Sequence, residues 1–246
     1  MKSAFSLNAR ALLLLCTLVA GRSIAQTDDA QAAYNFYDGT VGSQNSALNN
    51  GKVYVNPFRL KNDSHNFYKI NDYMAGSIVY GDQPYFDVAL KYDIHQDLLV
   101  LKPKNTANSI GITLINENVN SFSIDGKDFE NLGQIPNRPD FLTGFYERRY
   151  VGQNIKLYVK WHKSRSERIA NNVVFDDFSL KPAFVIEQGN TFKTINSKSD
   201  LIALFPAQKD RIRDLYSKDS RLEKTDRIQF MENMIRAIDN LTTAAR

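Results

Sequence analysis

The chain has 246 residues, 43% of them hydrophobic, and is long enough to bury a core without disulfide bonds. It carries 31 basic and 27 acidic residues, and the first 25 residues hold three of the bases and no acid. The remainder therefore has 28 basic and 27 acidic residues and a net charge of +1. This balance argues against nucleic-acid binding, because such proteins usually have a basic excess on one face. Cys16 is the only cysteine, which excludes internal disulfides, iron–sulfur clusters and cysteine-ligated zinc.

The N-terminus, residues 1–25, has the pattern of a signal peptide. Lys2 and Arg10 precede the apolar run ALLLLCTLVA, which is shorter than the ~20 residues that a membrane-spanning helix needs. Ser23 and Ala25 then place small side chains where signal peptidase cleaves, so we predict cleavage before Gln26.

The predicted export indicates a bacterial envelope protein. Leu15 stands before Cys16 where a lipoprotein signal normally has a small residue, so we do not expect lipidation. Exported eukaryotic domains often depend on disulfides, which the chain after residue 25 cannot form. No later stretch is apolar for long enough to span a membrane as a helix. We therefore expect the periplasm, the outer envelope or the medium as the location.

Residues 26–50 are polar and predict a flexible segment with one short element near YNFY. From about residue 51 short alternating apolar segments follow one another, separated by Gly, Asn, Asp and Pro, which favour turns. Short connections imply antiparallel pairing, because a parallel crossover needs a dozen or more residues. The predicted strands before residue 130 are KVYV, HNFYKI, GSIVY, YFDVALKYDI, DLLVLK, IGITLI and VNSFSI.

The segment KYDIHQDLLVLK, residues 91–102, allows two interpretations. Asp93, His95 and Asp97 are spaced as metal ligands on one strand face would be. However, the apolar residues of the preceding strand alternate on one face, and those after Asp97 resume the alternation, which predicts a tight turn between them. The alternating set is Phe86, Val88, Leu90, Tyr92 and Ile94. Since Asp side chains often bond nearby backbone groups in turns, we predict a polar hairpin turn and no metal site.

Two further hairpins and a helical region complete the predicted fold. FLTGFYERRY and IKLYVKWHK pair through the turn VGQN, and VVFDDFSL, PAFVIEQ and TFKTI supply the last strands, with Gly189-Asn190 as a turn. Ser197 with an acid three residues later predicts a helix start. A second helix should contain Pro206 in its first turn, and a third should run from about Glu223.

The hairpin around residues 145–163 has the most concentrated positive charge. Arg148, Lys156, Lys160 and His162 are predicted to share one face, with Trp161 on the opposite, packed face. Such a face could hold an anionic envelope glycan, a lipid headgroup or an acidic protein. The alternative is a solvated edge that lysine keeps soluble.

Other chemistry receives little support from the sequence. Asp176 and Asp177 are adjacent, so on a strand they point to opposite faces and not across a cleft. Aromatic residues interleave the strands and could stack on sugars, but they are more typical of core and cross-strand packing. We find no common hydrolase, zinc-protease, phosphate-loop or dinucleotide motif, and we predict no cofactor.

Four blocks in this order resemble a family of secreted bacterial proteins of unknown function. They are GSIVYGDQPYFDVALKYDIHQDLLVL, FSIDGKDF, GFYERRYVGQNIKLYVKWHK and SKSDLIALFPAQKDRI, and they lie within residues 50–220. The resemblance implies export and strands followed by helices. It implies no catalytic or binding residue.

Together these patterns predict one α+β domain over residues 51–246. It should be a mainly antiparallel twisted sheet, either a meander or an open half-barrel, followed by helices over about 197–243. We expect a non-enzymatic module that binds or scaffolds in the envelope. The alternatives are a hydrolase acting on envelope glycan or peptide, and a lipid or lipoprotein carrier with an apolar groove.

Overall fold

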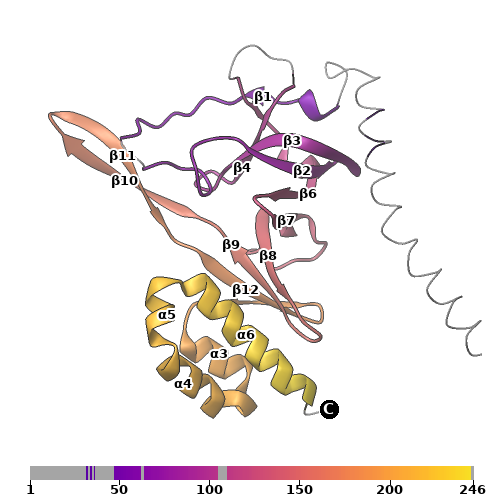
Figure 1. The fold of residues 1–246 in the computed structure, drawn as a ribbon, viewed down its shortest axis with the longest axis vertical. Helices are drawn as coiled ribbons and strands as arrows, with labels where there is room; N and C mark the ends of the chain where they lie inside the picture. Colours follow the sequence, from indigo (N-terminus) through magenta and orange to yellow (C-terminus); the bar gives the residue numbers. More distant parts are fainter. Residues whose placement is uncertain are drawn as a thin grey trace, which may run out of the picture.

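The structure is a computed structural model that describes residues 32, 34, 36, 47–61, 64–104 and 110–244. The predicted signal peptide and most of the predicted flexible segment lie outside these residues. The described part is an α+β arrangement, as predicted, in which an open antiparallel sheet precedes four α-helices (Figure 1). Among those helices none combines the length and the apolar character that crossing a membrane requires.

Eleven strands of the described chain form the main sheet, in the order β1, β5, β4, β3, β2, β6, β7, β8, β9, β12, β13. Neighbouring strands are antiparallel, as the short connections predicted. The chain runs outward from β2 to β5 and then returns to lay β6 against the free side of β2. The strand bounds are β1 Lys52–Val53, β2 Met74–Tyr80, β3 Gln83–Asp93, β4 Leu98–Lys102, β5 Ile112–Thr113, β6 Val119–Ile124, β7 Lys127–Asn131, β8 Phe145–Val151, β9 Lys156–Lys160, β12 Ala183–Gln188 and β13 Thr191–Ile195.

A bulge in β3 corrects one predicted face. Val88, Leu90 and Tyr92 are buried on one face as predicted, but Tyr85 shares that face in place of Phe86. The pairing shifts between Gly76 and Ile78 of β2, which face Val88 and Tyr85, so β3 has one more residue than β2 over this interval. The alternation therefore reverses at the bulge, which the sequence pattern alone does not reveal.

Two strands leave the main sheet and form a hairpin of their own. β10 (Lys163–Ala170) pairs with β11 (Val173–Leu180), and Figure 1 shows this hairpin projecting from the body of the molecule. We refer to residues 163–180 as the arm. The sequence pattern predicted β11 but not β10, because KSRSERIA has almost no apolar residues and so shows no alternation. A strand whose side chains are mostly exposed needs no such alternation.

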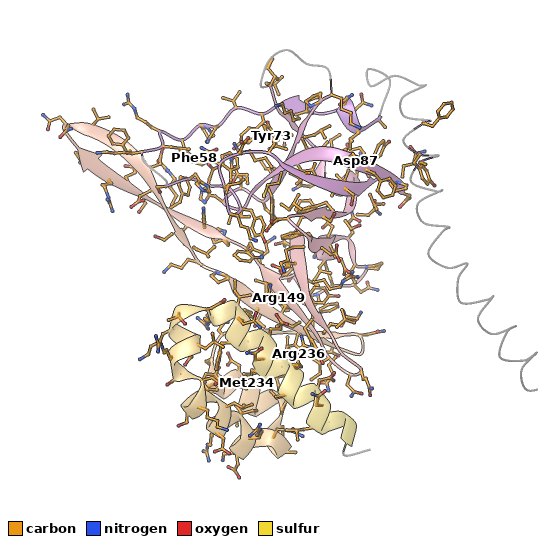
Figure 2. The ribbon with its side chains drawn as sticks, in the orientation of Figure 1. Phe58, Tyr73, Asp87, Arg149, Met234 and Arg236 are labelled. Atoms are coloured by element: carbon orange, nitrogen blue, oxygen red, sulfur yellow. The ribbon has the colours of Figure 1, made fainter. Side chains whose placement is uncertain are left out.

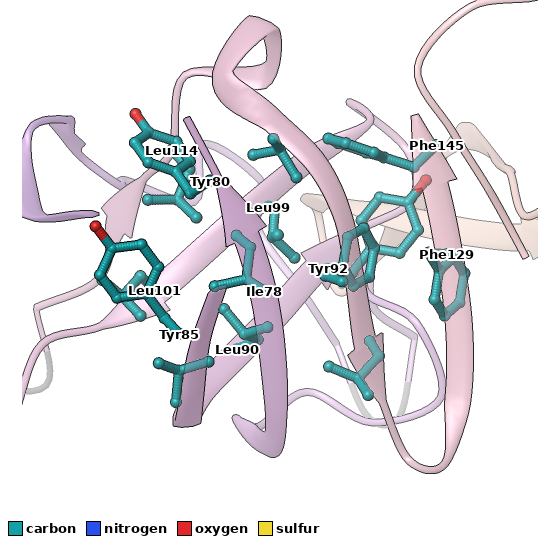
Figure 3. Close-up of a cluster of buried hydrophobic side chains, with 14 of the residues drawn as sticks. Ile78, Tyr80, Tyr85, Leu90, Tyr92, Leu99, Leu101, Leu114, Phe129 and Phe145 are labelled. Carbon is teal, nitrogen blue, oxygen red and sulfur yellow. The ribbon is translucent and has the colours of Figure 1, made fainter. Parts of the chain in front are cut away.

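Three clusters of buried apolar side chains lie on the two faces of the main sheet. The first fills the fold of β2, β3, β4, β6, β7 and β8 (Figure 3), and includes Ile78, Leu90, Tyr92, Phe122, Phe129 and Phe145. The second lies between β9, β12, β13 and the helices, and includes Leu157, Val159, Phe184, Ile212, Phe230 and Ile235. The third lies on the other face of β8, β9 and β12, and contains Leu132, Leu142, Tyr146, Tyr158, Val185 and Phe192.

The helices follow the predicted order with one correction. Ser197 and Asp200 form the predicted capping box at the start of α3 (Lys198–Leu204). Pro206 begins a short 3₁₀ turn before α4 (Lys209–Lys218). The predicted third helix is two helices, α5 (Ser220–Thr225) and α6 (Arg227–Ala244).

The break between α5 and α6 occurs at Asp226. Its side chain accepts a hydrogen bond from the backbone N–H of Gln229 at 2.9 Å, as a helix N-cap does. Ile228, Met231, Ile235 and Ile238 form the predicted apolar face of α6, and that face packs on the sheet. The apolar spacing thus identified the helix, whereas the cap decided where it begins.

Candidate functional site

Asp93, at the end of β3, is a fully buried carboxylate that organises the β3–β4 turn. Oδ1 accepts the backbone N–H groups of His95 and Gln96, both at 3.0 Å. Oδ2 accepts from Tyr54 Oη at 2.9 Å, from Asn66 Nδ2 at 2.6 Å and from Gln96 Nε2 at 2.7 Å. These contacts confirm the predicted polar turn, and they occupy both carboxylate oxygens.

His95 and His162 lie together at the base of the arm, and His65 lies beside Lys163 at the same base, an arrangement that no sequence pattern predicted. His95 Nδ1 lies 2.8 Å from the carbonyl oxygen of Lys163, and its ring stacks on His162 with centroids 6.2 Å apart. His65 Nδ1 lies 3.4 Å from Lys163 Nζ. Within the described ranges no group of three or more His, Cys, Asp or Glu is arranged to hold a metal ion.

Lys163 fastens the first residue of the arm to the segment that precedes β2. Its Nζ donates to the carbonyl oxygens of His65 at 2.7 Å and Phe67 at 2.8 Å. Burial lowers the pKa of Lys163 to about 8, while the nearby negative charge of Asp93 opposes the shift. The arm is therefore anchored by an ammonium group that holds its proton weakly.

This anchor predicts a stability that depends on pH. Because the unfolded lysine has the higher pKa, the unfolded chain binds more protons between about pH 8 and pH 10.5, so this group's contribution to the free energy of unfolding should rise with pH in that window. Urea unfolding of the protein and of Lys163→Met at pH 7.5 and pH 9.5 measures the difference. The variant should show the smaller rise; an equal rise in both would contradict the assignment.

A hollow opens on the face of β9 and β12 that points away from the helices. Its volume is about 390 Å3. Side chains of the β7–β8 connection and the β12–β13 hairpin form its wall, and charged residues with one tyrosine form its floor. We call it the outer groove; its floor contains Glu130, Lys156, Tyr158 and Glu187, and its wall contains apolar Leu132, Ile135, Pro136, Pro139 and Phe192 together with polar Asn137, Arg138 and Asn190. A second hollow of about 210 Å3 shares Glu130 and is also lined by Arg148.

Tyr158 lies at the centre of the floor between two carboxylates. Its hydroxyl lies 3.0 Å from Glu187 Oε2 and 3.3 Å from Glu130 Oε2. Lys156 Nζ donates to Glu187 at 2.9 Å, and Arg148 Nη1 donates to Glu130 at 2.9 Å. Burial and the two acids raise the pKa of Tyr158 well above its ordinary value. The floor therefore alternates acids and bases around a neutral phenol.

The four basic residues predicted to share one face lie in two places. Arg148 and Lys156 flank Tyr158, and their side chains are 41% and 42% exposed. Lys160 is more buried and donates to Asp97 Oδ2 at 2.6 Å. His162 lies beyond the end of β9, at the base of the arm. Two of the four therefore line the hollows, each already paired with a carboxylate.

Alternation along β9 puts Tyr158 on the same face as Lys156 and Lys160, but no sequence pattern selects Glu130 or Glu187. These acids come from β7 and β12, which neighbour β8 and β9 only in the folded sheet. The predicted packed position of Trp161 is confirmed, since its ring contacts the first and second clusters. Comparison of the chain with protein-family models, with curated proteins and with solved structures finds no match.

Proposed function

We propose that this protein is an exported binding module of the bacterial envelope and that the outer groove is its ligand site. The signal-peptide pattern of residues 1–25 supports export. The groove supports binding, because its volume falls in the ~300–1,000 Å3 range of small-ligand pockets and it joins a mostly apolar wall to a polar floor. That combination of wall and floor is the observation that carries the proposal.

The chemistry of the groove favours a hydroxyl-rich ligand such as a sugar unit of an envelope glycan. The groove is lined by two acids, Glu130 and Glu187, and by two bases, Lys156 and Arg138, so it offers donors and acceptors and no net charge. Sugar hydroxyls both donate and accept, and the C–H face of a sugar ring can lie against the apolar part of the wall. A charged floor does not suit an acyl chain, which makes a lipid carrier the weaker alternative.

An anionic glycan, a lipid headgroup and an acidic protein differ from a neutral glycan in one measurable way. Their binding would weaken as salt rises, because the Debye length falls from ~10 Å at 0.1 M to ~3 Å at 1 M. Binding of a neutral glycan should change little over the same series. A salt series therefore distinguishes the anionic ligands, which the sequence analysis considered for the basic residues, from the neutral glycan, which the charge-balanced groove favours.

Hydrolysis is a second candidate function. Glu130 and Glu187 both contact the hydroxyl of Tyr158, so their nearest oxygens lie closer together than the ~6.5–9.5 Å of inverting glycosidases, which leaves only a retaining mechanism to consider. However, a general acid must carry a proton, whereas each of these carboxylates is paired with a cation. Binding without turnover is thus better supported.

Calorimetry with neutral oligosaccharides prepared from envelope glycan tests the proposal. Tyr158→Phe removes the central hydroxyl, and Glu187→Gln removes the charge of one floor carboxylate. Each should weaken binding about tenfold, since a lost hydrogen bond of about 1.4 kcal/mol has that effect. Arg213→Gln, on an exposed face of α4, is the control and should bind as the wild type does.

Two outcomes would overturn this assignment. Equal affinity of wild type and both groove variants would show that the glycan binds elsewhere. The appearance of new reducing ends during incubation, abolished by Glu187→Gln, would replace the binding module with the hydrolase.

A further inference from the structure

The arm has one hydrogen-bonding edge that the rest of the described chain leaves open. Its eight residue pairs run without a break from Lys163–Leu180 to Ala170–Val173. Asn171 and Asn172 have φ values of 52° and 59°, as a two-residue type I′ turn requires. In such a hairpin alternate residues of each strand bond to the partner strand, and the others direct their N–H and C=O groups outward.

The outward residues of β10 follow from its first contact. The backbone N–H of Lys163 bonds to the carbonyl of Ile94 at 3.3 Å, outside the hairpin. Because the direction alternates along the strand, the backbone N–H and C=O groups of Arg165, Glu167 and Ile169 also point outward. These three residues have no backbone hydrogen-bond partner on that side among the residues described.

The two edges of the arm differ in whether other residues bond to their backbone groups. The outer edge of β11 is covered, since Asp176 N–H bonds to Arg59 O at 2.9 Å and Phe178 N–H bonds to Ser64 Oγ at 2.8 Å. β10 has no proline and no bulge to block pairing, and its charged side chains, Arg165, Glu167 and Arg168, restrict pairing to a register that matches opposite charges. A two-stranded hairpin gains stability from further strands, and among the described residues only the β11 edge of the arm has such cover. The open edge therefore favours a further strand.

We propose that a second copy of this chain supplies that strand, with β10 paired antiparallel to β10 about a two-fold axis at Ser166. For the two β10 strands to form hydrogen bonds, the residues whose N–H and C=O groups point outward must lie opposite each other. This condition allows only a few registers of the β10–β10 pair. Centring on Arg165 or on Glu167 places like charges opposite each other, which is destabilising. Centring on Ser166 places Arg165 opposite Glu167 of the second copy, and the symmetry repeats this opposite-charge pair.

The side chains can reach across the pair. Arg165 and Glu167 are 40% and 60% exposed, and within one chain Arg165 Nη2 already lies 2.9 Å from Glu167 Oε1. The result is a four-stranded sheet in the order β11, β10, β10, β11. Sheets of three or more strands can be stable independently, so this sheet meets that requirement. The contact is self-complementary, as a two-fold dimer requires. Ile169, 74% exposed in the single chain, falls opposite Lys163 of the second copy.

Charge reversal tests the register in solution. Sedimentation velocity of the purified exported protein should give a dimer. Arg165→Glu and Glu167→Arg each create like-charge pairs across the axis and should give monomers, whereas the double variant restores opposite charges and should return the dimer. A monomeric wild type would overturn the proposal.

A cysteine pair gives an independent test, because Arg165 also bonds to Asp176 within the chain and its replacement disturbs the arm itself. In a Cys16→Ser background, Ser166→Cys places two thiols opposite each other with Cβ atoms ~4.5–5.5 Å apart, close to disulfide geometry. Oxidation should give a covalent dimer. Ser164→Cys is the matched control, since Ser164 faces Arg168 of the second copy and should not cross-link. Failure of Ser166→Cys to cross-link, or equal cross-linking at both positions, would overturn the proposed pairing.

Discussion

Replacing Asp93 with alanine is expected to lower the free energy of unfolding by about 3–5 kcal/mol. The carboxylate is fully buried and accepts five hydrogen bonds: two from the turn backbone, one from the side chain of Gln96 in the same turn, and two from the distant side chains of Tyr54 and Asn66. A buried donor left without a partner costs about 1–3 kcal/mol, and the sum is reduced where the site relaxes. Urea unfolding measures the change.

Asp93→Asn is the matched control, because asparagine keeps the size and shape of the aspartate side chain but removes its charge. Asparagine keeps one oxygen that can accept the N–H groups of His95 and Gln96, but its amide nitrogen faces donors from Tyr54 and Asn66. The loss of stability should be large but smaller than for alanine. A loss below about 1 kcal/mol for Asp93→Ala would contradict the structural role. A melting temperature of the wild type that falls on addition of a chelator would restore the metal hypothesis.

Trp161→Ala is expected to destabilise the protein by about 3–5 kcal/mol, the usual cost of a large-to-small change in a core. The indole packs against both the sheet cluster and the helix cluster, and it meets Tyr68 edge-to-face with centroids 4.9 Å apart. Its Nε1–H donates to Glu147 Oε2 at 2.6 Å, and that carboxylate is 1% exposed. The substitution removes the packing and one donor of a buried charge.

Two variants separate these effects. Trp161→Phe keeps an aromatic ring but not the donor, so it should lose less stability than alanine. Lys156→Gln, on the opposite face of the same hairpin, should change stability by no more than about 0.5 kcal/mol, because exposed substitutions usually do. Equal and small effects of Trp161→Ala and Lys156→Gln would show that Trp161 does not hold the two clusters together.

The neighbourhood of Trp161 explains why its effect should be so large. Glu147 is also paired with Arg149 at 3.2 Å, and Arg149 Nε lies 2.7 Å from Glu232 of α6. Figure 2 shows Arg149 between the sheet and the helices. A buried ion pair that loses one partner is strongly destabilised. This line of charges therefore couples the sheet to α6 at the point where Trp161 packs.

Local sequence patterns predicted the parts of the fold that local physics controls. Alternation identified β3 and β9, the Ser197–Asp200 pair identified the start of α3, and turn residues placed the β3–β4 connection around Asp97. Each of these depends on contacts between residues a few positions apart, or on one buried face. Such features are visible in the sequence because a period of 2 or 3.6 is repeated along it.

The tertiary structure decided what depends on distant neighbours. The bulge that moves Phe86 off the buried face appears only when β3 is aligned with β2. β10 shows no apolar alternation because it lies outside the main sheet and its residues 165–169 are exposed. The floor of the outer groove joins Glu130 of β7 to Glu187 of β12 through Tyr158, which no local pattern could bring together.

By itself, then, the sequence determined the antiparallel strands, the polar turn at Asp93 and the order of sheet before helices. Only the tertiary structure determined which charges are paired, which edge of the arm is open among the described residues, and that His95 and His162 lie together. The physical reason is the range of the interactions. Turns, caps and amphipathic faces arise from near neighbours, whereas a pocket or an edge is set by pairing between strands far apart in the chain.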